Sequence, residues 1–340
     1  MARARSALAR RLREALDQRG YLEVQTPIAV PLAGQEPHLR PFETTFTPDA
    51  PVPPEGVHGG RRLHLHTSPE YAMKRLLARE GFSRCYQLAR VFRDGEVSRT
   101  HNPEFTLLEF YASPGSSETI MADLEQLVFA SASEARARKG HGRGSGTISL
   151  RPPFERLTCR EAFLRYAGFD PIPLDADAFA QAARACGMQP AAGASWDDVF
   201  TQVLLERIEP ALGIDSPTFL TEYPASQAAL ARLKPSDPRV AERFELYAGG
   251  LELANGFSEL CDSREQRRRL QGEQELRRRL GREVFPLDEK FLAALDHIGE
   301  AGGVAVGFDR LLMLVTGAET IADVLLFPAT EEYPAARRAP

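Results

Sequence analysis

Apolar and polar positions alternate with two different periods along this chain, and these periods predict a mixture of helices and strands. Residues 6–19 place apolar side chains every three or four positions, with arginines between them, so we expect a helix that ends at Gly20. Residues 21–27 and 63–66 alternate as short strands, and residues 71–79 return to the helical period. The apolar stripe of the first helix consists of Leu8, Leu12, Ala15 and Leu16.

The segment between residues 90 and 111 is predicted to be two strands joined by a polar loop. Residues 90–93 end one alternating run, and residues 105–111 form another with Leu107, Glu109 and Tyr111 on one face. The loop between them is rich in cations. Composition alone fits an ordinary hairpin with a solvated tip about as well as a binding loop.

The middle of the chain is predicted to be an insertion that consists mainly of helices. Residues 131–146 are small, charged and rich in glycine, which is typical of a flexible segment. Residues 217–224 form the next strand. Four segments have helical periods, at residues 113–135, 157–167, 177–186 and 196–208.

Residues 243–256 form the clearest hairpin, because two alternating runs flank a pair of glycines. This turn brings Glu245 and Glu252 close together across the strands, and Glu259 follows after the same seven-residue step. Acidic side chains so placed in apolar strands repel one another unless a cation lies between them. We therefore favour a cation site over three solvated glutamates.

The last third of the chain begins with a charged helix at residues 262–280, whose two arginine triplets are expected to form a solvated face. A glycine-rich strand at residues 302–310 then leads into a helix at residues 311–317, with Arg310 at the junction. Glycine lets the backbone approach a ligand closely, and an arginine there can bind phosphate through two hydrogen bonds. A buried strand–helix unit with an exposed arginine is the alternative.

Composition narrows the classes of function. The 340 residues are 43% hydrophobic and 26% charged, as in ordinary globular proteins, and the net charge of -5 argues against a chain that coats nucleic acid. Four scattered cysteines without a Cys-x-x-Cys pair indicate neither a zinc site nor a disulfide framework. Because no apolar run reaches the length of a membrane span, we expect a cytoplasmic protein with no membrane partner.

Four of these segments resemble the class II aminoacyl-tRNA synthetases, in the form of the lysine enzymes. Residues 92–93 (Phe-Arg) followed by His-Asn-Pro-Glu-Phe-Thr at residues 101–106 resemble motif 2, and residues 302–317 resemble motif 3. The helix, glycine and strand of residues 6–27 resemble motif 1, which forms the dimer interface in that family. Ser68, Pro69 and Glu70 begin the lysine-enzyme pattern Ser-Pro-Glu-x-x-x-Lys-Arg-Leu, although Glu70 could also simply complement the helix dipole.

The resemblance implies an α+β fold, with a largely antiparallel sheet flanked by helices rather than a doubly wound sheet. It implies one catalytic domain over residues 1–340, with a flexible or helical insertion at about residues 113–215, and a homodimer. Lysyl-tRNA synthetases carry an N-terminal OB-fold that reads the anticodon. Here the first helix begins within the first ten residues, so we expect no such domain.

The resemblance also implies roles in joining an amino acid to the α-phosphate of ATP. Arg93 would bind the α-phosphate and Arg310 the γ-phosphate, as the catalytic residues, while Glu245 and Glu252 would hold Mg²⁺. Phe105 would stack on adenine. The other expected ATP-binding residues are Asp94, Gly95, Glu96, His101, Asn102, Leu253 and Gly307. Glu70 would bind the amino group next to the carboxylate, and Tyr111 and Glu259 the far ammonium, so that the substrate-binding set is Ser68, Pro69, Glu70, Tyr111, Glu259 and Ala305.

One position departs from the family pattern. The lysine enzymes read Phe-Arg-Asn-Glu where this chain reads Phe-Arg-Asp-Gly-Glu, so the glutamate that normally contacts adenine is displaced by one residue. Glu96 is the candidate to replace it.

The best match is to the family of elongation factor P–(R)-β-lysine ligases, and it covers essentially the whole chain. Ala305 stands where tRNA-charging enzymes have glycine, and its methyl group would crowd an α-amino group. The resemblance implies that (R)-β-lysine or lysine is activated with ATP and passed to a lysine of elongation factor P, whereas tRNA is not expected to be the acceptor. Two alternatives stay open: a stand-alone lysyl-tRNA synthetase core, and a silent paralogue that binds lysine or nucleotide and regulates a partner.

Overall fold

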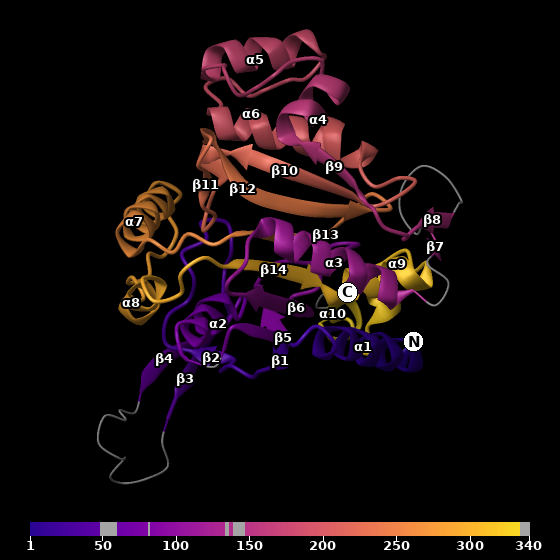
Figure 1. Ribbon diagram of the computed structural model, residues 1–340. Helices are drawn as coiled ribbons and strands as arrows, with labels where there is room; N and C mark the ends of the chain where they lie inside the picture. The colour runs from indigo at the N-terminus through magenta and orange to yellow at the C-terminus, as the bar shows by residue number, and fades with distance from the viewer. Residues whose placement is uncertain (48–59, 81, 133–135, 139–146, 334–340) are drawn as a thin grey trace, which may run out of the picture.

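The computed structural model describes residues 1–47, 60–80, 82–132, 136–138 and 147–333. Its centre is a nine-stranded sheet (Figure 1). In spatial order its strands are β1 (Leu22–Glu23), β5 (Arg84–Phe92), β6 (Glu104–Ala112), β14 (Gly302–Gly307), β13 (Leu251–Ser258), β12 (Asp237–Ala248), β10 (Thr218–Pro224) and β9 (Glu155–Thr158), with β11 (Leu233–Lys234) beside β12. Neighbours are antiparallel except β1 with β5 and β9 with β10, so the predicted α+β fold with a largely antiparallel sheet is confirmed.

Helices surround this sheet, and two small sheets accompany it. The small sheets are β2 (Ala29–Val30), β4 (Arg61–Leu65) and β3 (Glu43–Phe46), and β7 (Arg136–Arg138) with β8 (Thr147–Ser149). The α-helices are α1 (Ala2–Asp17), α2 (Glu70–Leu77), α3 (Ser117–Ser131), α4 (Cys159–Tyr166), α5 (Ala176–Ala185), α6 (Trp196–Val203), α7 (Ser263–Arg279), α8 (Glu289–Leu295), α9 (Phe308–Thr316) and α10 (Ala329–Glu332). Shorter helical turns are η1 (Leu204–Ile208), η2 (Glu209–Ala211), η3 (Ala225–Gln227) and η4 (Ile321–Val324).

One face of the central strands is covered by α1, α3 and α9 (Figure 1). The stripe predicted for the first helix is buried there, together with Leu108 and Phe110 of β6. Because side chains alternate along a strand, Leu107, Glu109 and Tyr111 point to the opposite face. The polar residues of that second face form the candidate site.

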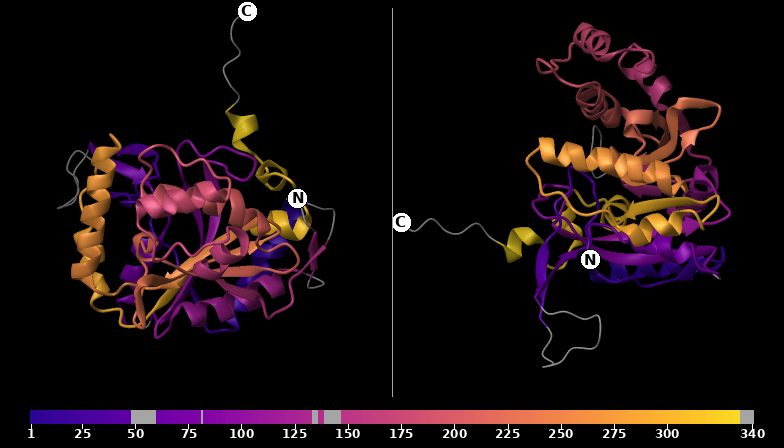
Figure 2. Two further views of the ribbon diagram at one scale, coloured as in Figure 1. Left: turned by 90° about the horizontal axis from the view of Figure 1, so that it is seen from above. Right: turned by 90° about the vertical axis from the view of Figure 1, so that its left-hand side faces the viewer.

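A layer of helices, α4 to α6, lies over the β9–β10–β12 end of the sheet (Figures 1 and 2). Its core is aromatic, and Phe163 and Phe200 stack with their ring centroids 5.1 Å apart. The prediction of a helix from residue 157 is wrong for its first two residues, because they pair with β10 as part of β9. Thr158 ends this strand and caps α4 through a reciprocal contact with Glu161, which explains the abrupt change.

The strand predicted at residues 21–27 is mostly absent from the sheet, since only β1 pairs with β5. Pro27 has no N–H with which to continue the ladder. The helix predicted at residues 113–135 begins later and spans α3. Most of the predicted flexible segment at residues 131–146 lies outside the described residues.

The hairpin of β12 and β13 is confirmed, but its register differs from a simple ladder. Tyr247 pairs with Glu252, whereas Glu245 pairs with Asn255, because the register shifts between Leu246 and Tyr247. The extra residue in β13 is a bulge, and bulges redirect the side chains that follow them. Glu245 and Glu252 are therefore diagonal neighbours rather than direct partners.

Helix α7 stands at one end of the sheet beside α8 (Figure 2). The prediction that both arginine triplets are solvated is wrong for Arg277, which is 3% exposed. Its guanidinium donates to the backbone oxygens of Glu36, Leu39 and Glu283 and lies over the ring of Phe285. Arg277 thus fastens the loop before β3 to the end of α7.

A search of the described helices for one both long and apolar enough to span a bilayer finds none.

Candidate active site

Two cavities, each of about 220 Å³, meet on the open face of the central strands. One lies between β6, β13 and α2 and is lined by carboxylates; we call it the amine cavity. The other lies between the β5–β6 loop, β13 and the start of α9; we call it the nucleotide cavity. Both are lined by Arg93, Leu107, Asn255 and Ala305, so a ligand in one can reach a ligand in the other at this junction.

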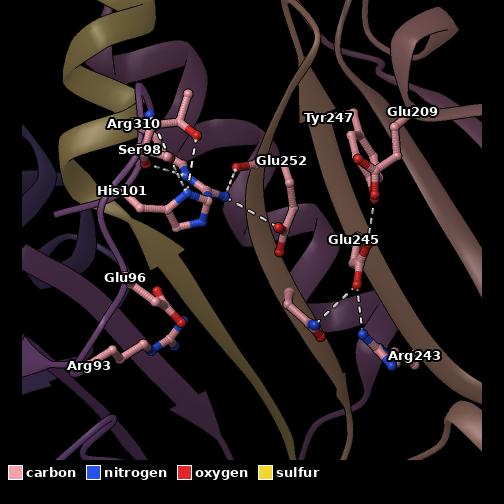
Figure 3. Close-up of polar contacts among 12 residues, drawn as sticks. Arg93, Glu96, Ser98, His101, Glu209, Arg243, Glu245, Tyr247, Glu252 and Arg310 are labelled. Carbon is pink, nitrogen blue, oxygen red and sulfur yellow. Dashed lines mark hydrogen bonds and ion pairs between the residues drawn. The ribbon is translucent and has the colours of Figure 1, made fainter. Parts of the chain in front are cut away.

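Arg310 is held at the rim of the nucleotide cavity by residues from two other segments (Figure 3). Its Nη1 donates to the backbone oxygen of Glu252 at 2.8 Å and to the Glu252 carboxylate at 3.2 Å. Its Nη2 lies 2.7 Å from Nε2 of His101. A guanidinium fixed in this way keeps its positive charge toward the cavity, where the phosphates of a nucleotide could bind.

The contact with Arg310 also defines the state of His101. Because arginine can only donate, Nε2 of His101 accepts, and its proton resides on Nδ1, which donates to Oγ of Ser98 at 2.8 Å. Burial, Arg310 and Arg93 lower the pKa of His101 to about 4. The ring is therefore neutral at physiological pH and serves to orient Arg310.

Arg93 lies at the junction of the two cavities. Its guanidinium stacks over Phe105 at 5.1 Å, and Glu96 is 3.8 Å from Nη1. Its buried Nε has no hydrogen-bond partner within the described residues. An unpaired buried donor of this kind is costly unless a ligand completes it, and a phosphate oxygen is a suitable acceptor.

Glu245 lies deeper, in β12, and both of its oxygens are already hydrogen-bonded (Figure 3). Oε1 accepts from Arg243 at 2.6 Å and from Asn255 at 3.2 Å. Oε2 accepts from the hydroxyls of Tyr223 at 2.6 Å and Tyr247 at 2.5 Å. Four donors fill the acceptor capacity of a carboxylate, so Glu245 could bind a metal only if a donor turned away.

Two further carboxyl groups lie near Glu245. Burial, then Glu245, raises the pKa of Glu252 despite its contact with Arg310. Burial, with Glu245 and Glu252 nearby, also raises the pKa of Glu209 to about 7, and the hydroxyl of Tyr247 lies 3.0 Å from it. A bound cation would relieve this crowding of negative charge.

Glu245 and Glu252 were predicted to hold Mg²⁺, which requires a suitable set of donor atoms around them. Among the described residues, no group of three or more His, Cys, Asp or Glu is arranged to hold a metal ion. Mg²⁺ commonly needs only one or two carboxylates, because phosphates and water complete its shell. Glu252 and Glu245 could therefore hold a magnesium ion that arrives with a nucleotide only after Glu245 releases one of its donors.

The amine cavity is built around Glu109, which is fully buried in β6. Ser68 donates to Oε1 of Glu109 at 2.7 Å, and Tyr111 donates to Oε2 at 2.9 Å. Burial, with Glu70 nearby, nevertheless raises the pKa of Glu109 to about 8. An ammonium group in the cavity would favour the ionised form of this carboxyl.

Lys74 of α2 is buried behind the same cavity, with 1% of its side chain exposed. Its Nζ lies 2.6 Å from Glu70 and 2.5 Å from Glu259. Burial raises the pKa of Glu259 to about 8 even though Lys74 opposes the rise. Within this cluster, the carboxylates of Glu70, Glu109 and Glu259 share the one ammonium of Lys74, so the cluster leaves room for two further positive charges.

Comparison with known proteins shows the family of this chain. Residues 1–331 match the family of tRNA synthetases class II (D, K and N). The elongation factor P–(R)-β-lysine ligase of Proteus mirabilis is 40% identical over 320 residues, which are 93% of this chain and 91% of that protein. The ligases of the same name from Yersinia enterocolitica and Klebsiella pneumoniae are each 39% identical, over 95% of this chain and 93% of theirs. The chain belongs to this ligase family.

Most residues expected from the family motifs line one of the two cavities. The nucleotide cavity is lined by Arg93, His101, Asn102, Phe105, Glu252, Leu253, Gly307 and Arg310, and the amine cavity by Ser68, Glu70, Tyr111 and Ala305. Glu259 reaches the amine cavity from behind Gly303. Pro69 lines a neighbouring cavity of about 350 Å³ that shares Ser68 and Glu70.

Residues 94–96 of the loop between β5 and β6, which were expected to bind ATP, do not line the nucleotide cavity. Asp94 pairs with Arg40 at 2.6 Å, and neither Asp94 nor Gly95 is among the residues that line the nucleotide cavity. Glu96 lies beside Arg93 rather than on the cavity wall. Asn102 uses both its amide groups on the backbone, donating to Glu104 and accepting from Ala329. It therefore ties the ligase's motif 2 loop to α10.

Sequence reasoning assigned no role to several charged residues that the fold brings to the site, among them Lys74, Glu109 and Glu209. Glu109 carried a signal, since a glutamate shares a strand face with Leu107 and Tyr111 in an otherwise apolar run. Glu209 carried none, because it reaches the site through η2 and its contact with Tyr247.

Proposed function

We propose that this chain activates (R)-β-lysine with ATP and transfers the acyl group to one lysine side chain of elongation factor P. One observation carries the proposal: a carboxylate-rich cavity, where Glu70, Glu109 and Glu259 outnumber Lys74 by two, meets a cation-lined cavity at the unpaired Nε of Arg93. Such a junction suits a substrate with two ammonium groups and one carboxylate that reacts with a nucleotide phosphate. The names of relatives at about 40% identity over more than nine-tenths of their length support the acceptor.

In the first step, a carboxylate oxygen of the substrate attacks the α-phosphorus of ATP, and pyrophosphate leaves. The residues supply orientation and charge rather than covalent chemistry. Arg93 would bind the α-phosphate while Phe105 stacks on the adenine. Arg310, held by Glu252 and His101, would neutralise the outer phosphates.

Glu252 and Glu245 would hold Mg²⁺, which supplies charge neutralisation on the phosphates when bound. Binding at Glu245 requires one of its four donors to turn away. Tyr247 can do so, because its hydroxyl already lies within reach of Glu209.

In the second step, the side-chain nitrogen of the acceptor lysine attacks the acyl carbonyl. The carbonyl–oxygen bond to AMP breaks, the nitrogen gives up a proton, and an amide and free AMP result. The preference for a β-amino acid would come from Ala305, which lies in β14 at the junction of the cavities. Its methyl group occupies space beside the position of an α-amino group.

We also propose that residues 1–340 form one catalytic domain with an insertion at about residues 113–215. The protein would form a homodimer through the α1–β1 region, and it would be located in the cytoplasm. Leu22 of β1 and Ile28 are 52% and 42% exposed, which supports a partner subunit at that edge. Size-exclusion chromatography with light scattering tests the dimer.

The deciding experiment measures the intact mass of elongation factor P after incubation with the chain, ATP, Mg²⁺ and (R)-β-lysine. We expect a gain of one lysyl residue, and no charging of tRNA(Lys) in a parallel reaction. Charged tRNA with unmodified factor would instead make the chain a stand-alone synthetase core. If neither product forms and no ATP–pyrophosphate exchange is detected, the chain is a silent paralogue.

A further inference from the structure

Lys74 is a buried cation that the reaction described above does not use. Its Nζ bridges Glu70, one turn earlier on α2, and Glu259, which follows β13. The ammonium lies over the ring of Phe257 at 5.0 Å and near Phe291 at 5.9 Å. A lysine so completely enclosed by carboxylates and aromatic rings has an environment made for a positive charge.

Burial opposes this charge, but Glu259 and Glu70 outweigh it and raise the pKa of Lys74 above its ordinary value. In return, the charge of Lys74 lowers the pKa values of Glu259 and Glu109 below what burial alone would produce. Lys74 is therefore permanently charged, and it favours ionised carboxylates in a cavity that otherwise disfavours them.

Other charged groups surround the cluster. Glu36 and Glu273 line the same cavity, and burial raises both pKa values, that of Glu273 to about 8, although Arg277 acts on both and Arg269 acts on Glu273. Arg93 and Arg243 line this cavity as well. The Cys261 thiol lies near Glu259 and Lys74, and burial raises its pKa to about 11, so it stays neutral. Tyr111 donates to Glu109, and burial raises its pKa well above the ordinary value.

We propose that Lys74 is a built-in counter-ion that holds Glu70 and Glu259 as an ion-paired clamp and so leaves the cavity ready for two further ammonium groups. Lys74 acts as a positioning residue, because it reaches the substrate only through the carboxylates. It fixes how many positive charges the substrate must bring. The inference rests on the proposed function, since it concerns a diammonium substrate.

The test is the affinity for (R)-β-lysine, measured by calorimetry from pH 6.5 to 9.5. In the unmodified protein, affinity should rise with pH with a midpoint near 8, where Glu109 and Glu259 are half ionised. Lys74→Met removes the charge but keeps the length of the side chain. The midpoint should then move up by at least about 1 unit, so that the affinity is still rising at pH 9.5, because an adjacent opposite charge usually lowers a carboxyl pKa by about 1–3 units.

The double variant Lys74→Met/Glu259→Gln restores the excess of two carboxylates and leaves fewer buried charges unpaired. Its midpoint should return to about that of the unmodified protein, and it serves if the single variant does not fold. Arg79→Met, which removes an exposed charge just beyond α2, is the matched control and should leave the midpoint unchanged.

Each outcome decides one question. If the unmodified protein does not bind (R)-β-lysine, the proposed function fails. If it binds and Lys74→Met weakens binding equally at every pH, Lys74 is only a packing residue and the inference is overturned. A double variant whose midpoint stays above that of the unmodified protein overturns it as well.

Discussion

Replacing Arg310 by alanine should abolish most adenylate formation without unfolding the protein. The guanidinium makes four polar contacts, two with Glu252, one with His101 and one with the backbone oxygen of Thr100, and about 20% of the side chain is exposed. Its loss leaves no unpaired buried cation. The carboxyl of Glu252, whose pKa is already raised by burial, can take up a proton instead.

The magnitude follows from the role assigned to Arg310. A fixed cation on the outer phosphates stabilises charge that develops as pyrophosphate leaves, and one such contact contributes about 2–4 kcal/mol in the transition state. At about 1.4 kcal/mol per tenfold, this corresponds to a loss of about 30-fold to 1000-fold in rate. Lysine at this position should recover part of the rate, since it keeps the charge but not the forked geometry.

ATP–pyrophosphate exchange measures this step alone. Arg99→Ala, in the β5–β6 loop that also carries His101, is the matched control because its side chain is 68% exposed. An NMR titration supplies a second readout: without Arg310, the pKa of His101 should rise from about 4 toward its ordinary 6.5. Exchange within about threefold of wild type, far below the loss expected for a phosphate contact, would remove Arg310 from the site.

Four further predictions concern the amine cavity and its surroundings. Glu259→Gln should weaken (R)-β-lysine binding by about 10-fold to 100-fold and ATP binding far less, as calorimetry would show; equal losses would end its role. Burial raises the pKa of Glu109 to about 8, so its contribution to the free energy of unfolding is complete below about pH 4.5 and is lost as the pH rises to 8. Glu109→Gln should therefore stabilise the ligand-free protein against denaturant at pH 8, and the difference in unfolding free energy should shrink toward pH 5. Arg277→Ala should cost about 1–3 kcal/mol of unfolding free energy, whereas the neighbouring exposed Arg278→Ala should cost almost none. Ala305→Gly should shift selectivity toward α-lysine by about 1–3 kcal/mol, measured as the ratio of kcat/KM values in pyrophosphate exchange.

Several elements could be predicted because local patterns determine them, although others, such as α8 and β9, were not predicted. The leucine stripe of α1, the glycine turn between β12 and β13 and the glycine-rich β14 each show their structure within a dozen residues. The errors fall where a distant segment decides. Leu157 has a helical neighbourhood in sequence, yet it pairs with Leu220, and that pairing made the strand.

Arg277 shows the same limit on a helix. Its position seven residues after Leu270 places it on the buried face of α7, unlike Arg278, but the sequence does not show its partners, which include backbone oxygens of a loop about 240 residues earlier in the chain. A run of charged residues predicts solvation only on average. A single arginine can be buried when a loop supplies enough acceptors.

Sequence motifs identified which residues line the site but not how their charges are neutralised. The motifs brought Arg93, Arg310 and Glu70 to the cavities, because a motif records the residue types and spacing that a reaction needs. It does not record how those groups are neutralised before the substrate arrives. That balance depends on contacts between strands and helices far apart in sequence.

Glu245 and Glu259 differ in how fully their carboxylates are paired before a ligand binds, although their spacing in the sequence is the same. Both are glutamates at the end of a seven-residue step from Glu252, and both are buried among apolar strands. Glu245 is saturated by four donors, whereas Glu259 has a single cationic neighbour, Lys74, and Oε1 without a hydrogen-bond partner in the described structure. The first must release a donor before it can bind a cation, while the second can accept one at once. The equal spacing therefore hides two kinds of carboxylate, and binding of the diammonium substrate should require less rearrangement than binding of the metal.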